Sequence, residues 1–380
     1  MENPFVYGKV VRGKYFADRE AEIAELKNDI VSSQNVIVFS PRRYGKTSLI
    51  LEVLDRVKAE GLLACYIDLF KVTSQETFIA AYAREVARLH GGRIQTMLKK
   101  IRELLPRLVP KVVVKGEKVD LGVEFEFDPR ADKTPLFDDL FEAVATVSLQ
   151  MGKKAVVVFD EFQEITGWDV KGQVERQMRT HFQMHESVSY IFMGSKRHLM
   201  QELFRNKNRP FYRFGKHFPL GKISKDEFAK FIQMRFEETG FQADLEVVEE
   251  VLQTTDDHPY YTQLLCHIIW DRKRQEKVIT KEDISLAVQE VFMREAHAFH
   301  DIWDLLPLKS RQLLVALAKE ESPQVRPFSS DFLRRHNLGS ASSVQRAIKR
   351  LLEEEVLEKT NGGYQFTDIF FKRWIREAFA

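Results

Sequence analysis

The fold of this 380-residue chain is constrained chiefly by an apolar run followed by a short loop that ends in Gly-Lys-Thr. Residues 35–39 (Asn-Val-Ile-Val-Phe) predict a buried strand, and hydrophobic residues at helical spacing predict a helix from Ser48 onward. The loop between them reads Ser-Pro-Arg-Arg-Tyr-Gly-Lys-Thr. A strand, a tight loop and a helix in this order are typical of a P-loop, where backbone N–H groups and the helix N-terminus converge on an anion.

The loop residues are therefore the expected phosphate-binding residues, together with the first residue of the helix: Ser40, Pro41, Arg42, Arg43, Tyr44, Gly45, Lys46, Thr47 and Ser48. We expect Lys46 to reach the β- and γ-phosphates and the Thr47 hydroxyl to bind Mg²⁺. The usual pattern begins with Gly where this chain has Ser40. Because Pro41 favours an extended conformation of the residue before it, we expect no positive φ at Ser40. The alternative is an ordinary strand–helix turn with the same letters.

The composition is that of a globular protein with nearly balanced charge. The formal net charge is +2, so contact with nucleic acid or an anionic membrane would need a local patch. Cys65 and Cys266 lie in apolar stretches without the spacing of a zinc site, and we expect both in the core. We find no signal-like N-terminus and no apolar run of transmembrane length, and so expect a cytoplasmic protein without a membrane partner.

Alternating strand and helix patterns follow the loop. Residues 62–69 predict a buried strand, and residues 74–89 predict a helix. An insert at about 93–134 then combines a helix over 94–105 with a β-hairpin that turns at Gly116-Glu117. A further helix is expected over 135–151.

Two carboxylates end the next apolar run, residues 155–159. Ligands bind at the carboxyl edge of a parallel sheet, so we expect Asp160 and Glu161 to reach the P-loop from a neighbouring strand. Asp160 would hold Mg²⁺, directly or through water. Glu161 would orient and deprotonate an attacking water.

The following strand, residues 189–195, ends in Gly194-Ser195. The Ser195 hydroxyl could sense a γ-phosphate or bond the water, while the alternative is a plain Gly-Ser turn. Arg213 precedes one more strand at 217–220. It is placed to face a nucleotide in its own chain or a neighbour's, although most arginines are surface residues.

The pattern over residues 224–298 predicts helices throughout. Asp257 and His258 end one helix, and Pro259 opens the next. A helix N-terminus entering from such a lid could face the nucleotide, whereas His258 itself is expected to cap or pack.

The last segment predicts a winged helix: helices near 309–318, 329–336 and 342–356, then two strands around Asn361-Gly362. The exposed face of the third helix would carry Gln345, Arg346, Lys349 and Arg350, the candidate nucleic-acid contacts. Glu353, Glu354 and Glu355 follow at once and would repel phosphates. Docking of a protein partner, or folding back as an inhibitory domain, are the alternatives to DNA.

The chain resembles the archaeal-type AAA ATPases, a P-loop family related to the STAND signalling ATPases, that end in a winged helix. The likeness rests on Asp18-Arg19-Glu20, residues 41–49, Phe159-Asp160-Glu161, Gly194-Ser195, Phe211-Tyr212-Arg213 and His258-Pro259-Tyr260. It implies ATP rather than GTP, a sensor role for Ser195, a trans-acting role for Arg213 and a lid motif at Pro259. The family usually has small residues where this chain has Asp257-His258.

The expected architecture is therefore α/β, a P-loop NTPase parallel sheet of the AAA+/ASCE type, a helical lid and a winged helix. The expected boundaries are 1–222, 223–298 and 299–380. The first hypothesis is an ATP-hydrolysing switch in which ATP between core and lid repositions the winged helix. Arg213 is the one residue that suggests a homo-oligomer. The second is a DNA-binding or protein-docking module in which nucleotide is structural and turnover negligible.

Overall fold

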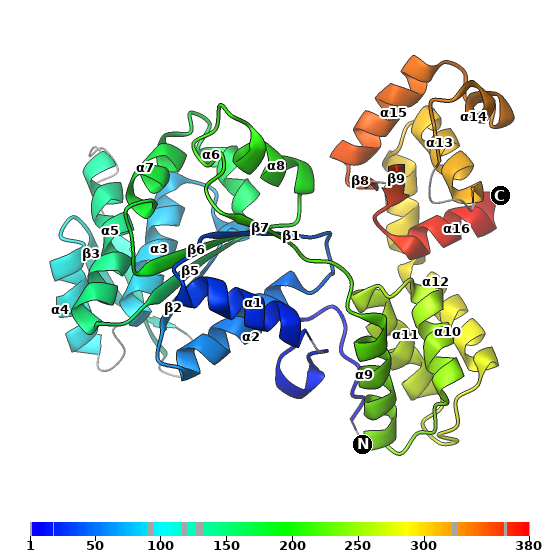
Figure 1. Cartoon of the computed structure of the whole chain (residues 1–380), viewed down its shortest axis with the longest axis horizontal. Helices are drawn as coiled ribbons and strands as arrows, with labels where there is room; N and C mark the ends of the chain where they lie inside the picture. The colour runs from blue at the N-terminus through cyan, green and yellow to red at the C-terminus, as the bar shows by residue number, and fades with distance from the viewer. Residues whose placement is uncertain are drawn as a thin grey trace. The chain divides into compact units, whose positions relative to one another are not determined.

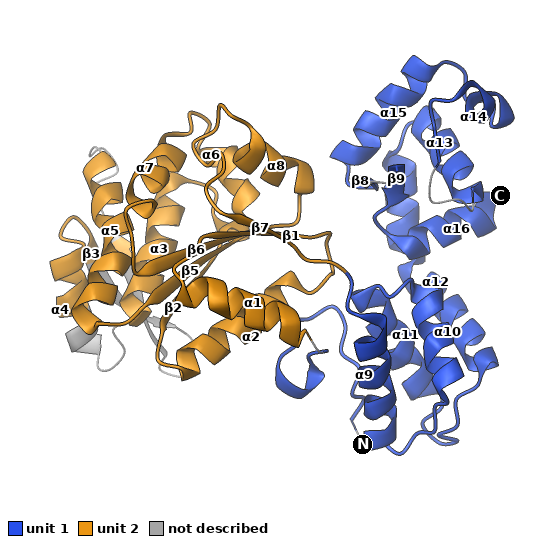
Figure 2. Ribbon diagram, viewed as in Figure 1, with its two compact units in different colours: residues 1–18, 222–380 blue, residues 19–221 orange. Residues whose placement is uncertain are grey.

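The computed structural model describes residues 2–17, 19–89, 94–115, 120–126, 133–320, 325–360 and 363–379 (Figure 1). The chain divides into two compact units (Figure 2). Unit 2 is Arg19–Gly221, and unit 1 joins Met1–Asp18 to Lys222–Ala380. The chain therefore passes from one unit to the other twice.

Unit 2 is built on a five-stranded parallel sheet with the order β2-β5-β6-β1-β7. The strands agree with the predicted ones: β1 (Val36–Phe39), β2 (Leu63–Asp68), β5 (Ala155–Asp160), β6 (Val188–Gly194) and β7 (Lys216–Pro219). One expectation is wrong. The strand that carries the two acids is not beside the P-loop strand, because β1 pairs with β6 and β7 instead. Local sequence patterns do not encode which buried strands pair.

Helices cover both faces of this sheet (Figure 1). One face carries α1 (Glu20–Val31) and α2 (Lys46–Ala59), and the other α3 (Gln75–Leu89), α5 (Thr134–Met151) and α7 (Gln173–Phe182). The second face is filled by an aromatic cluster in which Phe159 stacks on Phe192, with ring centroids 5.6 Å apart. Side chains alternate along a strand, so Val156, Val158 and Asp160 point to the α1/α2 face.

The remaining described elements of unit 2 are short or belong to the insert: η2 (Leu69–Lys71), α4 (Ile94–Leu104), β3 (Val109–Lys115), β4 (Asp120–Glu126), η3 (Phe162–Glu164), α6 (Ile165–Trp168) and α8 (Arg197–Arg205). Strands β3 and β4 pair antiparallel, which confirms the predicted hairpin. Its expected turn at Gly116-Glu117 lies outside the described residues, as does Asp18 of the resemblance.

Unit 1 is helical with one small hairpin: η1 (Gly13–Tyr15), α9 (Lys225–Glu238), α10 (Leu245–Thr255), α11 (Pro259–Arg272), α12 (Lys281–Leu305), α13 (Leu308–Lys319), α14 (Ser330–Arg335), α15 (Ala341–Glu353), β8 (Leu357–Thr360), β9 (Gly363–Phe366) and α16 (Ile369–Phe379). The predicted winged-helix elements are all present, while the expected turn residues Asn361-Gly362 lie outside the described residues. Helix α16 is an addition that the pattern did not predict. Helix α12 continues through the expected boundary at 298–299.

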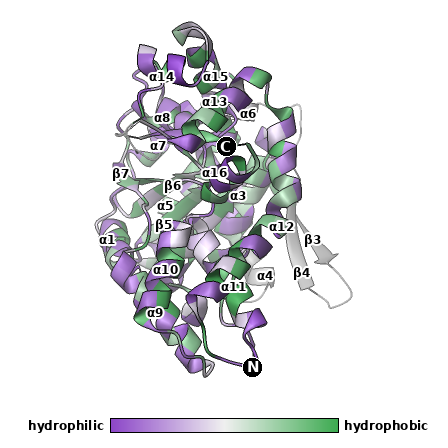
Figure 3. Ribbon diagram, turned by 90° about the vertical axis from the view of Figure 1, so that its right-hand side faces the viewer, coloured by the Kyte–Doolittle hydropathy of each residue, from purple (hydrophilic) through white to green (hydrophobic). Residues whose placement is uncertain are grey.

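The lid helices and the winged helix share one hydrophobic cluster. Helix α11 is buried along most of its length, and its hydrophobic residues are green in Figure 3. Tyr261 of α11 stacks on Phe370 of α16 at 4.5 Å, and Trp303 of α12 stacks on Phe379 at the same distance. The N-terminal segment joins this cluster through Phe5, whose ring lies 4.6 Å from that of Phe236. No helix in the described part of the chain is long and apolar enough to span a bilayer.

Candidate nucleotide site

The P-loop leaves β1 and turns into α2 through two residues with left-handed backbone. Gly45, the N-cap of α2, has φ 84°, and Arg43 has φ 65°. Ser40 is buried and is not among the described residues with positive φ, as the Pro41 argument predicts. Glycine costs nothing in this conformation, which accounts for Gly45 at the point where the loop becomes helix.

Arg19, which lies outside the P-loop sequence, contacts the backbone of the loop. Its guanidinium is almost fully buried and donates to the Tyr44 carbonyl at 3.3 Å and to the Gly221 carbonyl at 3.0 Å, while pairing with Glu22 at 2.7 Å. Arg19 and Gly221 are the first and last residues of unit 2. The P-loop is thus tied to both ends of the unit that carries it.

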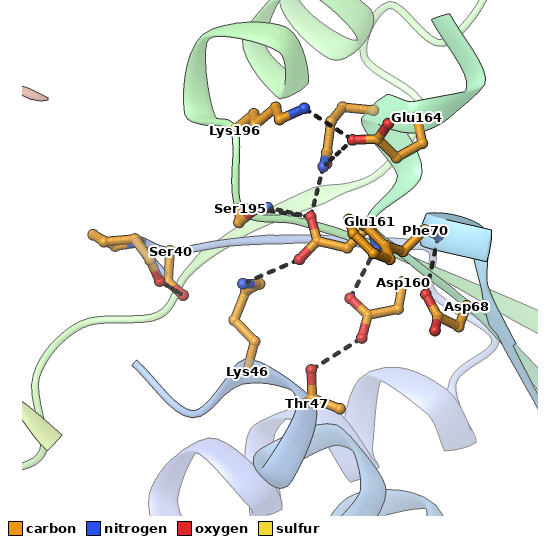
Figure 4. Close-up of polar contacts among 12 residues, drawn as sticks. Ser40, Lys46, Thr47, Asp68, Phe70, Asp160, Glu161, Glu164, Ser195 and Lys196 are labelled. Carbon is orange, nitrogen blue, oxygen red and sulfur yellow. Dashed lines mark hydrogen bonds and ion pairs between the residues drawn. The ribbon is translucent and has the colours of Figure 1, made fainter. Parts of the chain in front are cut away.

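Asp160 points at the first turn of α2 (Figure 4). Its Oδ2 accepts hydrogen bonds from Thr47 Oγ1 at 3.0 Å and from Tyr66 Oη at 2.6 Å, and its Oδ1 accepts from the Glu161 backbone N–H at 2.9 Å. The predicted meeting of Thr47 with Asp160 is confirmed. Burial raises the pKa of the Asp160 carboxyl, although the hydrogen bond from Tyr66 opposes the shift.

Glu161 turns away from the strand because its backbone is left-handed, with φ 49°. Its Oε1 lies 4.0 Å from Lys46 Nζ, and its Oε2 accepts from Ser195 Oγ at 2.8 Å and Ser195 N at 3.2 Å (Figure 4). Burial raises the pKa of Glu161, but Lys46 and the hydrogen bonds outweigh burial and hold that pKa below its ordinary value. An ionised carboxylate therefore faces the loop.

These side chains form a donor set that fits a magnesium–nucleotide complex. Mg²⁺ takes oxygen ligands, and the Thr47 hydroxyl and Asp160 carboxylate supply two of them side by side. Lys46 supplies the cation, and the N-terminus of α2 supplies backbone donors for phosphate. The site can hold a polyphosphate with a carboxylate, Glu161, beside its end.

Of the other predicted site residues, Arg213 lies in unit 2, whereas Pro259 and the candidate contacts on α15 belong to unit 1. Arg213 is exposed, has φ 53° and lies with its guanidinium 5.3 Å from the ring centroid of its neighbour Tyr212. Pro259 is the first residue of α11 in unit 1. On α15 the side chains predicted to be exposed are exposed: Gln345, Arg346, Lys349 and Arg350.

The acidic run at the end of α15 contacts two of these basic residues. Lys349 Nζ lies 3.8 Å from Glu353, and an Arg350 nitrogen lies 3.6 Å from Glu354. Exposed ion pairs at this spacing are weak. The two carboxylates therefore offset part of the positive charge of Lys349 and Arg350 without holding these side chains in one position. The acidic side chains at this end of the helix therefore oppose the binding of phosphate groups.

Three residues at the site escaped the sequence reasoning. Tyr66 and Gln163 contact the two acids, and Arg19 entered only through the resemblance. The one signal for Tyr66 was its place two residues before the end of a strand. Gln163 comes within reach only because Glu161 adopts a left-handed backbone, which nothing in the sequence indicates.

Comparison with known proteins agrees with this geometry. Residues 16–265 match the family described as an ATPase domain predominantly from Archaea, and residues 297–377 match a probable winged helix domain. No curated protein matches the chain.

Two solved structures share the fold over nearly the whole chain. A Walker-type ATPase of Pyrococcus abyssi has a TM-score of 0.67 at 15% identity, covering 98% of this chain and 99% of that one. The ORC2 protein of Aeropyrum pernix, solved in ADPNP–ADP complexes, has a TM-score of 0.59 at 13% identity, covering 99% and 96%. With the family match extending over well more than half of its length, the chain belongs to the ATPase domain family found predominantly in Archaea, and a winged helix domain follows that ATPase domain.

Proposed function

We propose that the protein binds ATP with Mg²⁺ at the P-loop of unit 2 and hydrolyses the γ-phosphate. The observation that carries the proposal is the convergence of Lys46 and Thr47 with Asp160 and Glu161 at the carboxyl edge of the sheet. Family membership makes a nucleotide the expected ligand. ATP and hydrolysis go beyond what membership alone establishes.

Each residue has a distinct task in this proposal. Lys46 binds the β- and γ-phosphates, and Thr47 with Asp160 would hold Mg²⁺. A metal held there would offset the negative charge of the phosphates. Glu161 takes a proton from the attacking water and aligns it for in-line attack, and Ser195 Oγ, 2.8 Å from Glu161, holds that carboxylate in place.

Two substitutions test the assignment. Lys46→Ala removes the phosphate-binding cation and should weaken ATP binding at least tenfold, because a hydrogen bond to a charged group contributes about 1.5–3 kcal/mol. Glu161→Gln keeps the shape and donor contacts of the site, so ATP should still bind while phosphate release slows on the order of a hundredfold. Binding is read with a fluorescent ATP analogue and turnover by phosphate release. Wild-type turnover in Glu161→Gln would contradict the role of Glu161.

Arg213 is proposed to complete the site of a neighbouring copy, since it is exposed and its guanidinium lies over the ring of Tyr212. A chain with Arg213→Ala keeps its P-loop, and a chain with Glu161→Gln keeps its arginine. Mixing the two should therefore restore turnover above the sum of the separate rates, and wild-type turnover per chain should rise with concentration. A mixture no faster than its parts, with a flat concentration profile, would argue for a monomeric site.

The exposed basic face of α15 favours duplex DNA as a second ligand, through Arg346, Lys349 and Arg350. We expect binding of labelled duplex at low salt that weakens log-linearly as salt rises. Replacing all three by Ala should abolish it, whereas replacing Glu353 and Glu354 by Gln should strengthen it, because those acids offset two of the cations. Absence of binding at low salt would leave protein docking as the task of the winged helix.

A further inference from the structure

Gln163 is a buried polar side chain that the proposed mechanism has not used. It is 1% exposed, and its Nε2 donates to Glu161 Oε2 at 2.5 Å. The same nitrogen lies 3.4 Å from Glu164 Oε1. Its Oε1 has no hydrogen-bond partner among the described residues. The amide is thus held as a donor, and its acceptor end is left unsatisfied, which costs free energy in a buried place.

The end of β6 is shaped to admit this amide. A Cβ added at Gly194 would lie 2.3 Å from Gln163 Oε1 and 2.5 Å from Met200 Sδ, both well inside contact distance. Gly194 therefore leaves space that the Gln163 and Met200 side chains occupy, and a larger residue there would displace them. Gly194 and Ser195 both affect Glu161. Gly194 leaves room for the Gln163 amide, and Ser195 supplies the two other hydrogen-bond donors to the carboxylate.

The three donors all reach the same oxygen. Ser195 N, Ser195 Oγ and Gln163 Nε2 surround Glu161 Oε2, whereas Oε1 faces Lys46 Nζ at 4.0 Å. The carboxylate is therefore turned so that Oε1 is the oxygen directed toward the P-loop. A carboxylate on a left-handed residue has no regular strand or helix to fix it, so its orientation depends on these contacts.

We propose that Gln163 is the positioning residue that fixes the orientation of Glu161, leaving Oε1 to accept the proton of the attacking water, with Gly194 as its steric counterpart. This inference rests on the proposed hydrolysis. It assigns the donor role to a side chain two residues beyond the acid pair, and it explains why a buried amide with an unsatisfied oxygen is tolerated.

The test uses Gln163→Met, which keeps the volume over Gly194 and removes the donor. We expect kcat to fall on the order of tenfold, because a misdirected catalytic group loses much of its effect, with the ATP dissociation constant unchanged within about twofold. Gln177→Met is the matched control, since Gln177 donates to the Thr134 carbonyl on α5, away from the acids. Thermal unfolding of both variants should match the wild type.

A double-mutant cycle separates positioning from a general structural role. In a Glu161→Gln background, Gln163→Met should cost less than about twofold in single-turnover rate, because the group it orients is already gone. The same loss in both backgrounds, or wild-type kcat in Gln163→Met, would overturn the inference while leaving ATP hydrolysis in place. A wild-type chain without turnover would instead overturn the proposed function, and the inference with it.

Discussion

At the scale of single residues, the site depends on contacts that fix its carboxylates rather than on the carboxylates alone. Asp160 Oδ2 accepts from Thr47 on α2 and from Tyr66 on β2, so two elements hold one oxygen. Burial alone raises the pKa of Asp160, and the Tyr66 hydroxyl works against that shift. The tyrosine is thereby suited to keeping a buried metal ligand ionised and aimed.

Tyr66→Phe should raise the Mg²⁺ concentration needed for half-maximal turnover on the order of tenfold, since removing the partner of a metal ligand weakens the metal site. Nucleotide binding measured without Mg²⁺ should not change. Tyr190→Phe is the matched control: that hydroxyl bonds His185 at 2.7 Å on the other face of the sheet. Equal Mg²⁺ dependence in both variants would count against the role of Tyr66.

Some contacts of the site could be predicted from the sequence, and others could not. Lys46, Thr47, Asp160 and Glu161 could be placed together, since strands of a parallel sheet end at one edge. Tyr66 and Gln163 could not. Contact of Tyr66 with Asp160 depends on β2 pairing with β5, and contact of Gln163 with Glu161 depends on one left-handed backbone angle.

At the scale of elements, β1 and β5 were correctly identified but their order was not. Apolar runs predict that a strand is buried, and β6 is as apolar as β5, so nothing local shows that β6 lies between the other two. The same limit applies to α16. Three helices and a hairpin already satisfy the winged-helix pattern. Helix α16 packs on α13 and also stacks on the lid helix α11, more than a hundred residues earlier in the chain.

The contact between α5 and α7 predicts a pH dependence of stability. His181 of α7 contacts Glu142 at 2.6 Å and Asp138 at 2.9 Å on α5. Burial lowers the pKa of His181, but the two carboxylates outweigh it and raise that pKa above its ordinary value. A raised histidine pKa stabilises the fold fully below pH ~6.5, and the stabilisation is lost as pH rises through the folded value.

His181→Gln should therefore lower the free energy of unfolding by about 1 kcal/mol near pH 6, and by less at pH 8.5, where the wild type has lost its imidazolium. Calorimetric unfolding at the two pH values measures the difference.

His198→Gln, at an exposed histidine of α8, is the control and should show little change at either pH. The pKa of the neighbouring His185 is lowered by burial and also by the His181 charge, and His185 shares Glu142 with His181, so its titration changes with the substitution and belongs to the measured difference. A larger loss at pH 8.5 than at pH 6 would reverse the sign and refute the argument.

At the scale of the whole molecule, the packing of the lid against the winged helix within unit 1 restricts how a nucleotide switch can work. The lid and the winged helix share helix α12 and one hydrophobic cluster, and aromatic stacks join α16 to α11 and α12. Separating them would expose several large rings, each contributing about 3 kcal/mol or more when buried. A switch driven by ATP should therefore move the lid and the winged helix together, as one body, against unit 2.

Spin-label distances measure this directly. Cysteines replacing Glu249 of α10 and Arg334 of α14 report within unit 1, and cysteines replacing Lys153 and Arg334 report between the units; all three positions are exposed. The natural Cys65 and Cys266 are buried and shielded from the label.

The ATP complex of a Glu161→Gln chain is compared with the ADP complex of the same chain. We expect the second distance, between the units, to shift and the first distance, within unit 1, to stay constant. Adding Lys46→Ala should remove the response to ATP. A shift of the first distance would mean that the winged helix moves against the lid, which the shared core of unit 1 argues against, and no shift of either would leave ATP turnover without a mechanical output.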